Sequence, residues 1–181
     1  MDRLTYIICG KLYDGLDDEF KEGYKILVKN DKIEEVGPGI ICPESAEVVD
    51  LSDATVTPGM IDAHMHMDYI DWHTIREEVY TTSEEAKTIA IVRTAQKTLS
   101  RGFTTIRHTG GITSNGFGVL DVKRAIEKGY ITGSRIVAAP RFLCGAGSHG
   151  DLSQGFAGNP ELSMILQNLR PTLGAGKDFF V

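Results

Sequence analysis

The sequence predicts an α/β protein in which a small β domain, residues 1–57, precedes alternating strands and helices over residues 58–181. Up to residue 57, short apolar and β-branched runs are separated by turn-forming residues, which is typical of strands. From residue 59 onward, apolar runs of strand length alternate with longer segments of helical periodicity. This alternation indicates parallel strands joined by right-handed crossovers. The pair Pro58-Gly59 marks the change between the two patterns.

The β domain is expected to contain several short strands joined by turns. Asn30 and Asp31 both tolerate the left-handed backbone conformation and predict a turn, and Gly10 and Gly15 are expected to bracket another. The domain either folds alone or packs on a partner, and the second is favoured because about 57 residues bury only a thin core. The predicted strands are 4–9, 24–29, 32–36, 47–51 and 54–57.

The second part begins with a predicted strand over residues 60–67. Thr82, with Glu85 three positions later, predicts a capping box at the start of a helix. A shorter helix is expected to end at Gly129, since glycine commonly terminates helices. The remaining predicted elements are a helix over 83–100, strands over 103–106 and 136–139, a helix over 162–169, and a strand over 179–181.

Two histidines, His64 and His66, lie two positions apart in the predicted strand 60–67. Side chains alternate between the faces of a strand, so both imidazoles are expected to point the same way. Two neutral imidazoles on one face suit a divalent transition metal, which binds such nitrogens at about 2.0–2.1 Å. Asp62 is expected to share that face and to orient one of the ligands.

Composition narrows the classes of function. The chain is 41% hydrophobic and 24% charged, as in an ordinary soluble protein, and its net charge of −6 argues against general nucleic-acid binding. No apolar run approaches the ~18 residues of a membrane helix, and the N-terminus lacks a signal-peptide layout. The three cysteines are widely spaced, which predicts reduced thiols in a cytoplasmic protein.

Four segments in this order resemble the amidohydrolase superfamily, which comprises metal-dependent hydrolases built on a (β/α) barrel. They resemble most the branch that includes imidazolonepropionase-like enzymes and Xaa-Pro dipeptidases. The first segment, with the Pro-Gly break and His-x-His, is specific to the superfamily, and the others indicate the branch. The matching segments are 56–66, 101–107 followed by Gly110-Gly111, 133–139, and 148–151.

The resemblance implies a partial TIM-type (β/α) barrel preceded by a small β-sandwich-like domain. A complete barrel needs about 250 residues, so residues 58–181 supply about half of one. Family members of this kind take further ligands from later strands: a carboxylated lysine, two histidines and an aspartate. Aligning the family's lysine motif on Asp178 places Val181 where the lysine stands. No catalytic residue is therefore assigned, and weak metal binding and little turnover are expected of this chain alone.

The resemblance also implies a function, which is hydrolysis of a C–N bond in an amide, dipeptide or cyclic amide by metal-activated water. His64 and His66 are the expected metal ligands, with zinc the expected metal. Arg107 and His149 are candidate substrate contacts, although each also has a structural interpretation as an ion pair or a loop hydrogen bond. His108 stands where the branch carries aspartate and is not expected to be a ligand.

Two alternatives remain open at the level of the sequence. A half barrel exposes strand edges and apolar helix faces, so the chain is expected to form a homo-oligomer. In the first alternative, the chain is a catalytically silent fragment that acts as a binding or assembly module. In the second, it is a deaminase or cyclic-amidase member of the superfamily. The expected partner is a small-molecule substrate, without nucleic acid or membrane.

Overall fold

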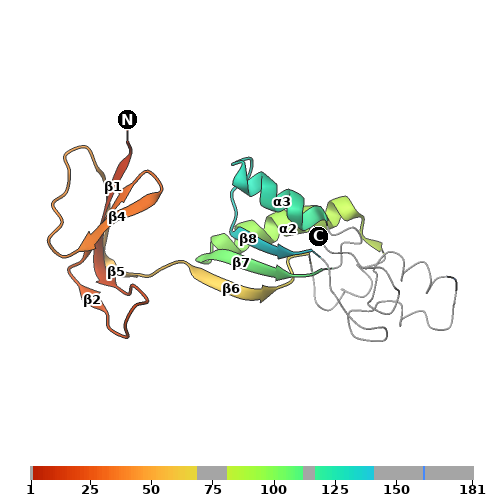
Figure 1. Cartoon of the computed structure of the whole chain (residues 1–181), viewed down its shortest axis with the longest axis horizontal. Coiled ribbons are helices and arrows are strands. Elements are labelled where there is room, and N and C mark those ends of the chain that lie inside the picture. The colour runs from red at the N-terminus through yellow and green to blue at the C-terminus, as the bar shows by residue number, and fades with distance from the viewer. Residues whose placement is uncertain (1, 69–80, 112–116, 141–160, 162–181) are drawn as a thin grey trace. The chain divides into compact units, whose positions relative to one another are not determined.

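The computed structural model describes residues 2–68, 81–111, 117–140 and 161 (Figure 1). The chain divides into two compact units, Met1–Pro58 and Gly59–Val181. Each unit contains one sheet in its described part, and the two sheets are built differently. None of the helices in the described part has the length and apolar character needed to cross a membrane.

The first unit is a five-stranded sheet centred on β1 (Leu4–Leu12). β1 pairs antiparallel with β3 and parallel with β5, so it is hydrogen-bonded on both sides. The turn between β3 and β4 is confirmed, and Asn30 adopts the left-handed conformation with φ 58°. The other strands are β2 (Lys21–Glu22), β3 (Lys25–Lys29), β4 (Lys32–Gly37) and β5 (Glu47–Val56).

Two expectations for this unit were wrong. The two short strands predicted over residues 47–57 form one continuous strand, β5. Gly10 lies inside β1 and not at a turn, and the pairing of β1 with β5 shifts register there. A Cβ at Gly10 would collide with the main-chain oxygen of Ser52 and lie 2.8 Å from that of Ala54. Glycine is therefore required because the two backbones approach closely.

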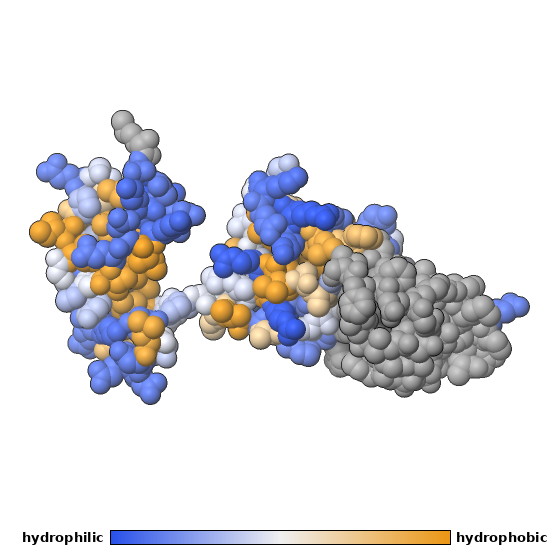
Figure 2. Space-filling model, in the orientation of Figure 1, coloured by the Kyte–Doolittle hydropathy of each residue, from blue (hydrophilic) through white to orange (hydrophobic). Residues whose placement is uncertain are grey.

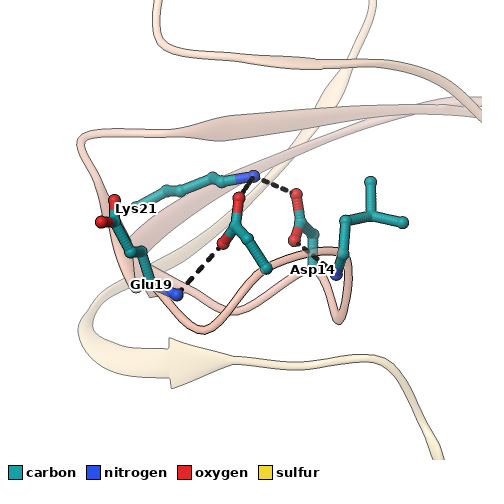
Figure 3. Close-up of polar contacts among 5 residues, drawn as sticks. Asp14, Glu19 and Lys21 are labelled. Carbon is teal, nitrogen blue, oxygen red and sulfur yellow. Dashed lines mark hydrogen bonds and ion pairs between the residues drawn. The ribbon is translucent and has the colours of Figure 1, made fainter.

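The loop between β1 and β2 is held by a charged side chain (Figure 3). The Lys21 ammonium contacts the carboxylate of Asp14 and lies 3.3 Å from that of Asp17. The same carboxylates accept main-chain N–H groups from Leu16 at 3.0 Å and Glu19 at 3.1 Å. The acidic segment is therefore organised around the half-buried ammonium group of Lys21.

The first unit has a small core, and its cluster of buried side chains consists of Cys9, Leu12 and Ile26. Many large apolar side chains remain at its surface, where Figure 2 shows orange atoms gathered. The five strands form one sheet, and the described residues contain no second sheet of the kind that a β-sandwich has. The exposed apolar residues are Leu16, Phe20, Ile33, Val36, Ile41 and Val48.

The second unit is a three-stranded parallel sheet in the order β6-β7-β8 (Figure 1). Its helices α2 and α3 pack against each other and against the sheet, as right-handed crossover connections require. This mixed α/β arrangement has the strand and helix order that the sequence predicted. The elements are β6 (Met60–Met65), α2 (Glu84–Leu99), β7 (Phe103–Thr109), α3 (Phe117–Glu127) and β8 (Arg135–Ala139).

The core of the second unit lies between the sheet and the helices. Several of its side chains are completely buried, because the helices lay their apolar stripes on one face of the sheet. Ser134 joins three elements at the base of this layer, since its hydroxyl donates to Phe103 O at 2.6 Å and its amide donates to Ala95 O at 3.1 Å. The core residues are Met67, Ile91, Ala95, Ile106, Val119, Val122 and Ile136.

The start of α2 differs from the prediction. Ser83 and not Thr82 is the N-cap, and its hydroxyl accepts the N–H of Ala86 at 3.2 Å. The end of α3 is as expected, with Gly129 at φ 71°. The predicted helix 162–169 and strand 179–181 lie outside the described residues, and the half barrel stays a prediction.

Candidate metal site

The two histidines of the His-x-His motif lie close together at the C-terminal end of β6. The ring centres of His64 and His66 are 5.4 Å apart, in an edge-to-face arrangement. His64 is exposed and His66 is half-buried. The strand ends at Met65, so His66 lies just beyond it and not inside the predicted strand 60–67. This end of a parallel sheet is where the functional side chains of barrel enzymes gather.

An irregularity in the β6–β7 pairing alters the role expected of Asp62. Asp62 pairs with Ile106, but Met65 pairs with His108, so β6 contains one extra residue between these pairs. Ile106 lies in the core, so this register places Asp62 on the core side of the sheet. The Asp62 carboxylate accepts the main-chain N–H of His64 at 3.0 Å. Asp62 therefore fixes the backbone beside the ligand, and its predicted place on the histidine face was wrong.

The imidazole of His66 is oriented by a main-chain group of β7's C-terminal end. Its Nδ1 lies 2.6 Å from the carbonyl oxygen of Gly110. A carbonyl oxygen can only accept, so Nδ1 carries the proton and Nε2 keeps its lone pair. In the neutral ring this tautomer puts the lone pair on Nε2, and such a hydrogen bond is the usual way in which a ligating histidine is held.

His108 is a buried group whose surroundings the sequence did not identify. Its side chain is fully buried on β7, and its Nδ1 accepts the main-chain N–H of Met67 at 3.2 Å. Burial lowers the pKa of His108, the charge of Asp68 opposes that shift, and His66 adds to it. The imidazole is therefore held neutral. Alternation from Ile106 is the signal that predicts this inward-facing position.

Asp68 is a second buried polar residue beside the histidines. Its side chain is fully buried, and its carboxylate lies against the backbone of Gly111. A Cβ at Gly111 would collide with the Asp68 carboxylate. The Gly110-Gly111 pair thus leaves room for the aspartate while Gly110 contacts His66. The sequence identified both glycines only as part of a segment that resembles the family.

The geometry of the two histidines fits a divalent metal. Two imidazoles bound through Nε2 to one tetrahedral zinc ion have ring centres about 5 Å apart. The separation of 5.4 Å between His64 and His66 matches that arrangement. Within residues 2–68, 81–111, 117–140 and 161, no group of three histidine, cysteine or acidic residues is placed to hold a metal. The two predicted ligands, His64 and His66, are thus fewer than the three protein ligands that a catalytic zinc site needs.

The two predicted substrate contacts have different outcomes. Arg107 lies on β7 with its side chain exposed, on the opposite face of the strand from Ile106 and His108. The ion pairs of the described residues do not include it. His149 lies outside the described residues.

Comparison with protein families gives one match, to the amidohydrolase family over residues 55–155, which is more than half of the chain. The matched range contains both histidines, Gly110 and His108. It begins near the end of the first unit and extends beyond β8.

Individual relatives match shorter stretches of sequence. Dihydroorotase from Geobacter sulfurreducens is 50% identical over 42 residues, which are 23% of this chain and 10% of that protein. Imidazolonepropionase from Fusobacterium nucleatum is 41% identical over 61 residues, which are 32% of this chain and 14% of that protein. The chain therefore matches only a small part of the length of these curated relatives.

Among solved structures, a Xaa-Pro dipeptidase with methionine bound in its active site is similar in fold. The match has a TM-score of 0.73 and 29% sequence identity, and it covers 84% of this chain and 37% of the dipeptidase chain. The chain thus spans a little over a third of that structure.

Proposed function

We propose that this chain, which belongs to the amidohydrolase family, supplies the first two metal ligands of a hydrolase that acts on C–N bonds. The observation that carries the proposal is the paired arrangement of His64 and His66, with the Nδ1 of His66 held on the carbonyl oxygen of Gly110. Both histidines come from the end of one strand, so a single element brings them together. Further ligands must come from residues outside the described part or from another chain.

The proposed roles of the residues follow from their contacts. His64 and His66 hold a divalent ion, with zinc the metal best suited to paired imidazoles. When bound, the ion supplies an activated water at neutral pH and polarises the substrate carbonyl. Gly110 keeps the imidazole of His66 in the ligating tautomer, and Asp62 fixes the backbone of His64. No proton-transfer residue is assigned.

The proposed substrate is a small amide, a dipeptide or a cyclic amide. The structural likeness to a dipeptidase supports this class, since a dipeptidase cleaves the amide bond of a dipeptide. Arg107 is proposed as a contact for a substrate carboxylate, because its guanidinium is exposed and such groups bind carboxylates with two parallel hydrogen bonds. His149 is proposed as a second contact on the strength of its sequence motif.

Metal analysis tests the ligand assignment. The purified chain is equilibrated with zinc, and bound metal is measured for the wild type, His64→Ala, His66→Ala and the double variant. We expect the double variant to lose the bound zinc. Cys42→Ser is the matched control, because Cys42 is an exposed thiol outside the proposed site, and exposed thiols are a common source of adventitious zinc binding. Unchanged zinc content in the double variant, or loss in Cys42→Ser alone, contradicts the assignment.

Turnover tests the reaction separately from the metal. The zinc-loaded chain is assayed against a panel of dipeptides, acyl-amino acids and cyclic amides. Hydrolysis that disappears in His66→Ala supports a C–N hydrolase. If zinc binds through the two histidines and nothing is hydrolysed, the chain is a metal-binding module without activity of its own.

A further inference from the structure

The segment that carries His66 is tied to β7 by an imidazole as well as by main-chain bonds. The pairing between β6 and β7 ends with Met65 opposite His108. Beyond it, the N–H of Met67 donates to the Nδ1 of His108 at 3.2 Å. The His108 side chain thus takes the place that a carbonyl of the neighbouring strand has in a regular sheet.

The hydrogen bond from Met67 to His108 lies in a buried environment. The side chain is fully buried, and Met67 beside it is fully buried too. A buried N–H is costly to leave without an acceptor, so the bond is strongly favoured over its absence. Nδ1 must be unprotonated to accept, and the neutral ring then carries its proton on Nε2.

His66 is therefore held at two points, by His108 and by Gly110, which lie two positions apart in the chain. His108 binds the amide of Met67, which belongs to the peptide group that follows His66. Gly110 binds the Nδ1 of the His66 ring at 2.6 Å. The first contact fixes the backbone of His66, and the second fixes its ring. The two contacts lie on the consecutive residues His66 and Met67, so the Met67 contact restrains the backbone from which the ring reaches Gly110.

We propose that His108 is a positioning residue: by accepting the Met67 amide it keeps the imidazole of His66 on Gly110, with Nε2 directed to a metal. This inference rests on the proposed function only in its last clause. His108 is not itself placed as a ligand, since its ring centre lies 6.5 Å from that of His66 and the described residues contain no three-ligand group.

The tautomer of His66 tests the proposal in the metal-free full-length chain. The ¹⁵N chemical shifts of the imidazole nitrogens distinguish a protonated Nδ1 from a protonated Nε2. We expect the wild type to hold the Nδ1–H form. His108→Asn and His108→Gln form a matched pair: both are polar, but only asparagine places its oxygen near the position of Nδ1. We expect His108→Asn to keep the Nδ1–H form and His108→Gln to give a mixture.

Cobalt(II) affinity supplies the second readout. We expect it to fall about 10–100-fold in His108→Gln, in line with other changes behind metal ligands, and to stay within about threefold of the wild type in His108→Asn. A merely structural role predicts equal losses of unfolding temperature in both variants with the His66 tautomer unchanged. That result in folded variants overturns the proposal.

The wild type alone decides the question if the variants do not fold. An Nε2–H form of His66, or a Met67 amide that exchanges with solvent as fast as an unbonded one, overturns the role of His108. Failure of the proposed function has a different signature. In that case cobalt binding is absent or independent of His64 and His66, whereas the tautomer of His66 still reports on His108.

Discussion

The two sheets of this chain bury their side chains to very different degrees. In the first unit, the buried cluster of Cys9, Leu12 and Ile26 keeps 3–7% of its surface exposed, whereas five core residues of the second unit keep none. The two longest strands, β1 with 9 residues and β5 with 10, belong to the first unit, so strand length is not the cause. The difference is the helix layer, because α2 and α3 pack on the β6–β8 sheet, whereas the described residues of the first unit include no helix.

The difference in packing between the two units bears on the position of the proposed metal site. Histidine ligands need rigid supports, and rigidity comes from a closely packed layer beneath them. His66 stands on such a layer, through Met67 and His108. In the first unit, the charged groups form ion pairs at the surface and lack that support.

The largest expected effect on stability comes from truncating one buried isoleucine to alanine in each of the two cores. Ile106→Ala removes a fully buried side chain between sheet and helices and is expected to cost about 4–5 kcal/mol, near the upper limit for such changes. Ile26→Ala in the first unit is expected to cost about 2 kcal/mol, because its surroundings are open and collapse more easily. Hydrogen exchange of β7 and β3 segments, read by mass spectrometry, measures each unit separately. Equal costs contradict the comparison.

A second pair of variants tests the close approach of β1 and β5. Gly10→Ala places a methyl group against the oxygens of Ser52 and Ala54 and is expected to destabilise the first unit by about 1–3 kcal/mol. Gly37→Ala is the control, since a Cβ there has nothing within 4 Å. Urea unfolding followed by circular dichroism gives both values. A Gly10→Ala chain as stable as the control would show that the strands separate at no cost.

The start of α2 offers a smaller effect. Ser83→Ala removes the acceptor of the Ala86 N–H and is expected to cost about 1 kcal/mol. Thr82→Ala is expected to change the stability by no more than a few tenths of that, because Thr82 is not the cap. Thermal unfolding of the two variants decides between the neighbouring positions. A loss of stability that is larger in Thr82→Ala than in Ser83→Ala would contradict this assignment and favour Thr82 as the cap.

The smallest effect is a pH dependence in the first unit. The Lys21 ammonium, and then the N–H of Leu16, lower the pKa of Asp14 from 3.8. The carboxylate is thus favoured in the folded state, so its contribution is complete above pH 3.8 and is lost as the pH falls through the lowered value. We expect the difference in urea midpoint between wild type and Asp14→Asn to shrink as the pH falls from 6 to about 2.

Lys21→Met serves as the control for that prediction, because it removes the cation and keeps the apolar stem. It is expected to reduce the same acid-dependent component, and high salt is expected to reduce it further. A difference between wild type and Asp14→Asn that grows toward low pH contradicts the sign of the effect.

Local patterns predicted the elements but not their exact ends. The turn at Asn30, the helix end at Gly129 and the alternation of strands and helices after Gly59 all follow from backbone preference and periodicity. The position of the α2 cap was wrong by one residue, since Ser83 and Thr82 offer the same hydroxyl chemistry. Gly10 was read as a turn because close approach of a distant strand leaves no local signal.

By itself, the sequence determined that a His-x-His motif follows a Pro-Gly break and opens a strand–helix series, because spacing along one strand is a local property. Only the tertiary structure decided which groups lie behind that motif. His108 and Gly110 come more than forty residues later and reach His66 through the β6–β7 pairing. The extra residue in that pairing is a property of two strands together, and it separates Asp62 from the face that the histidines share.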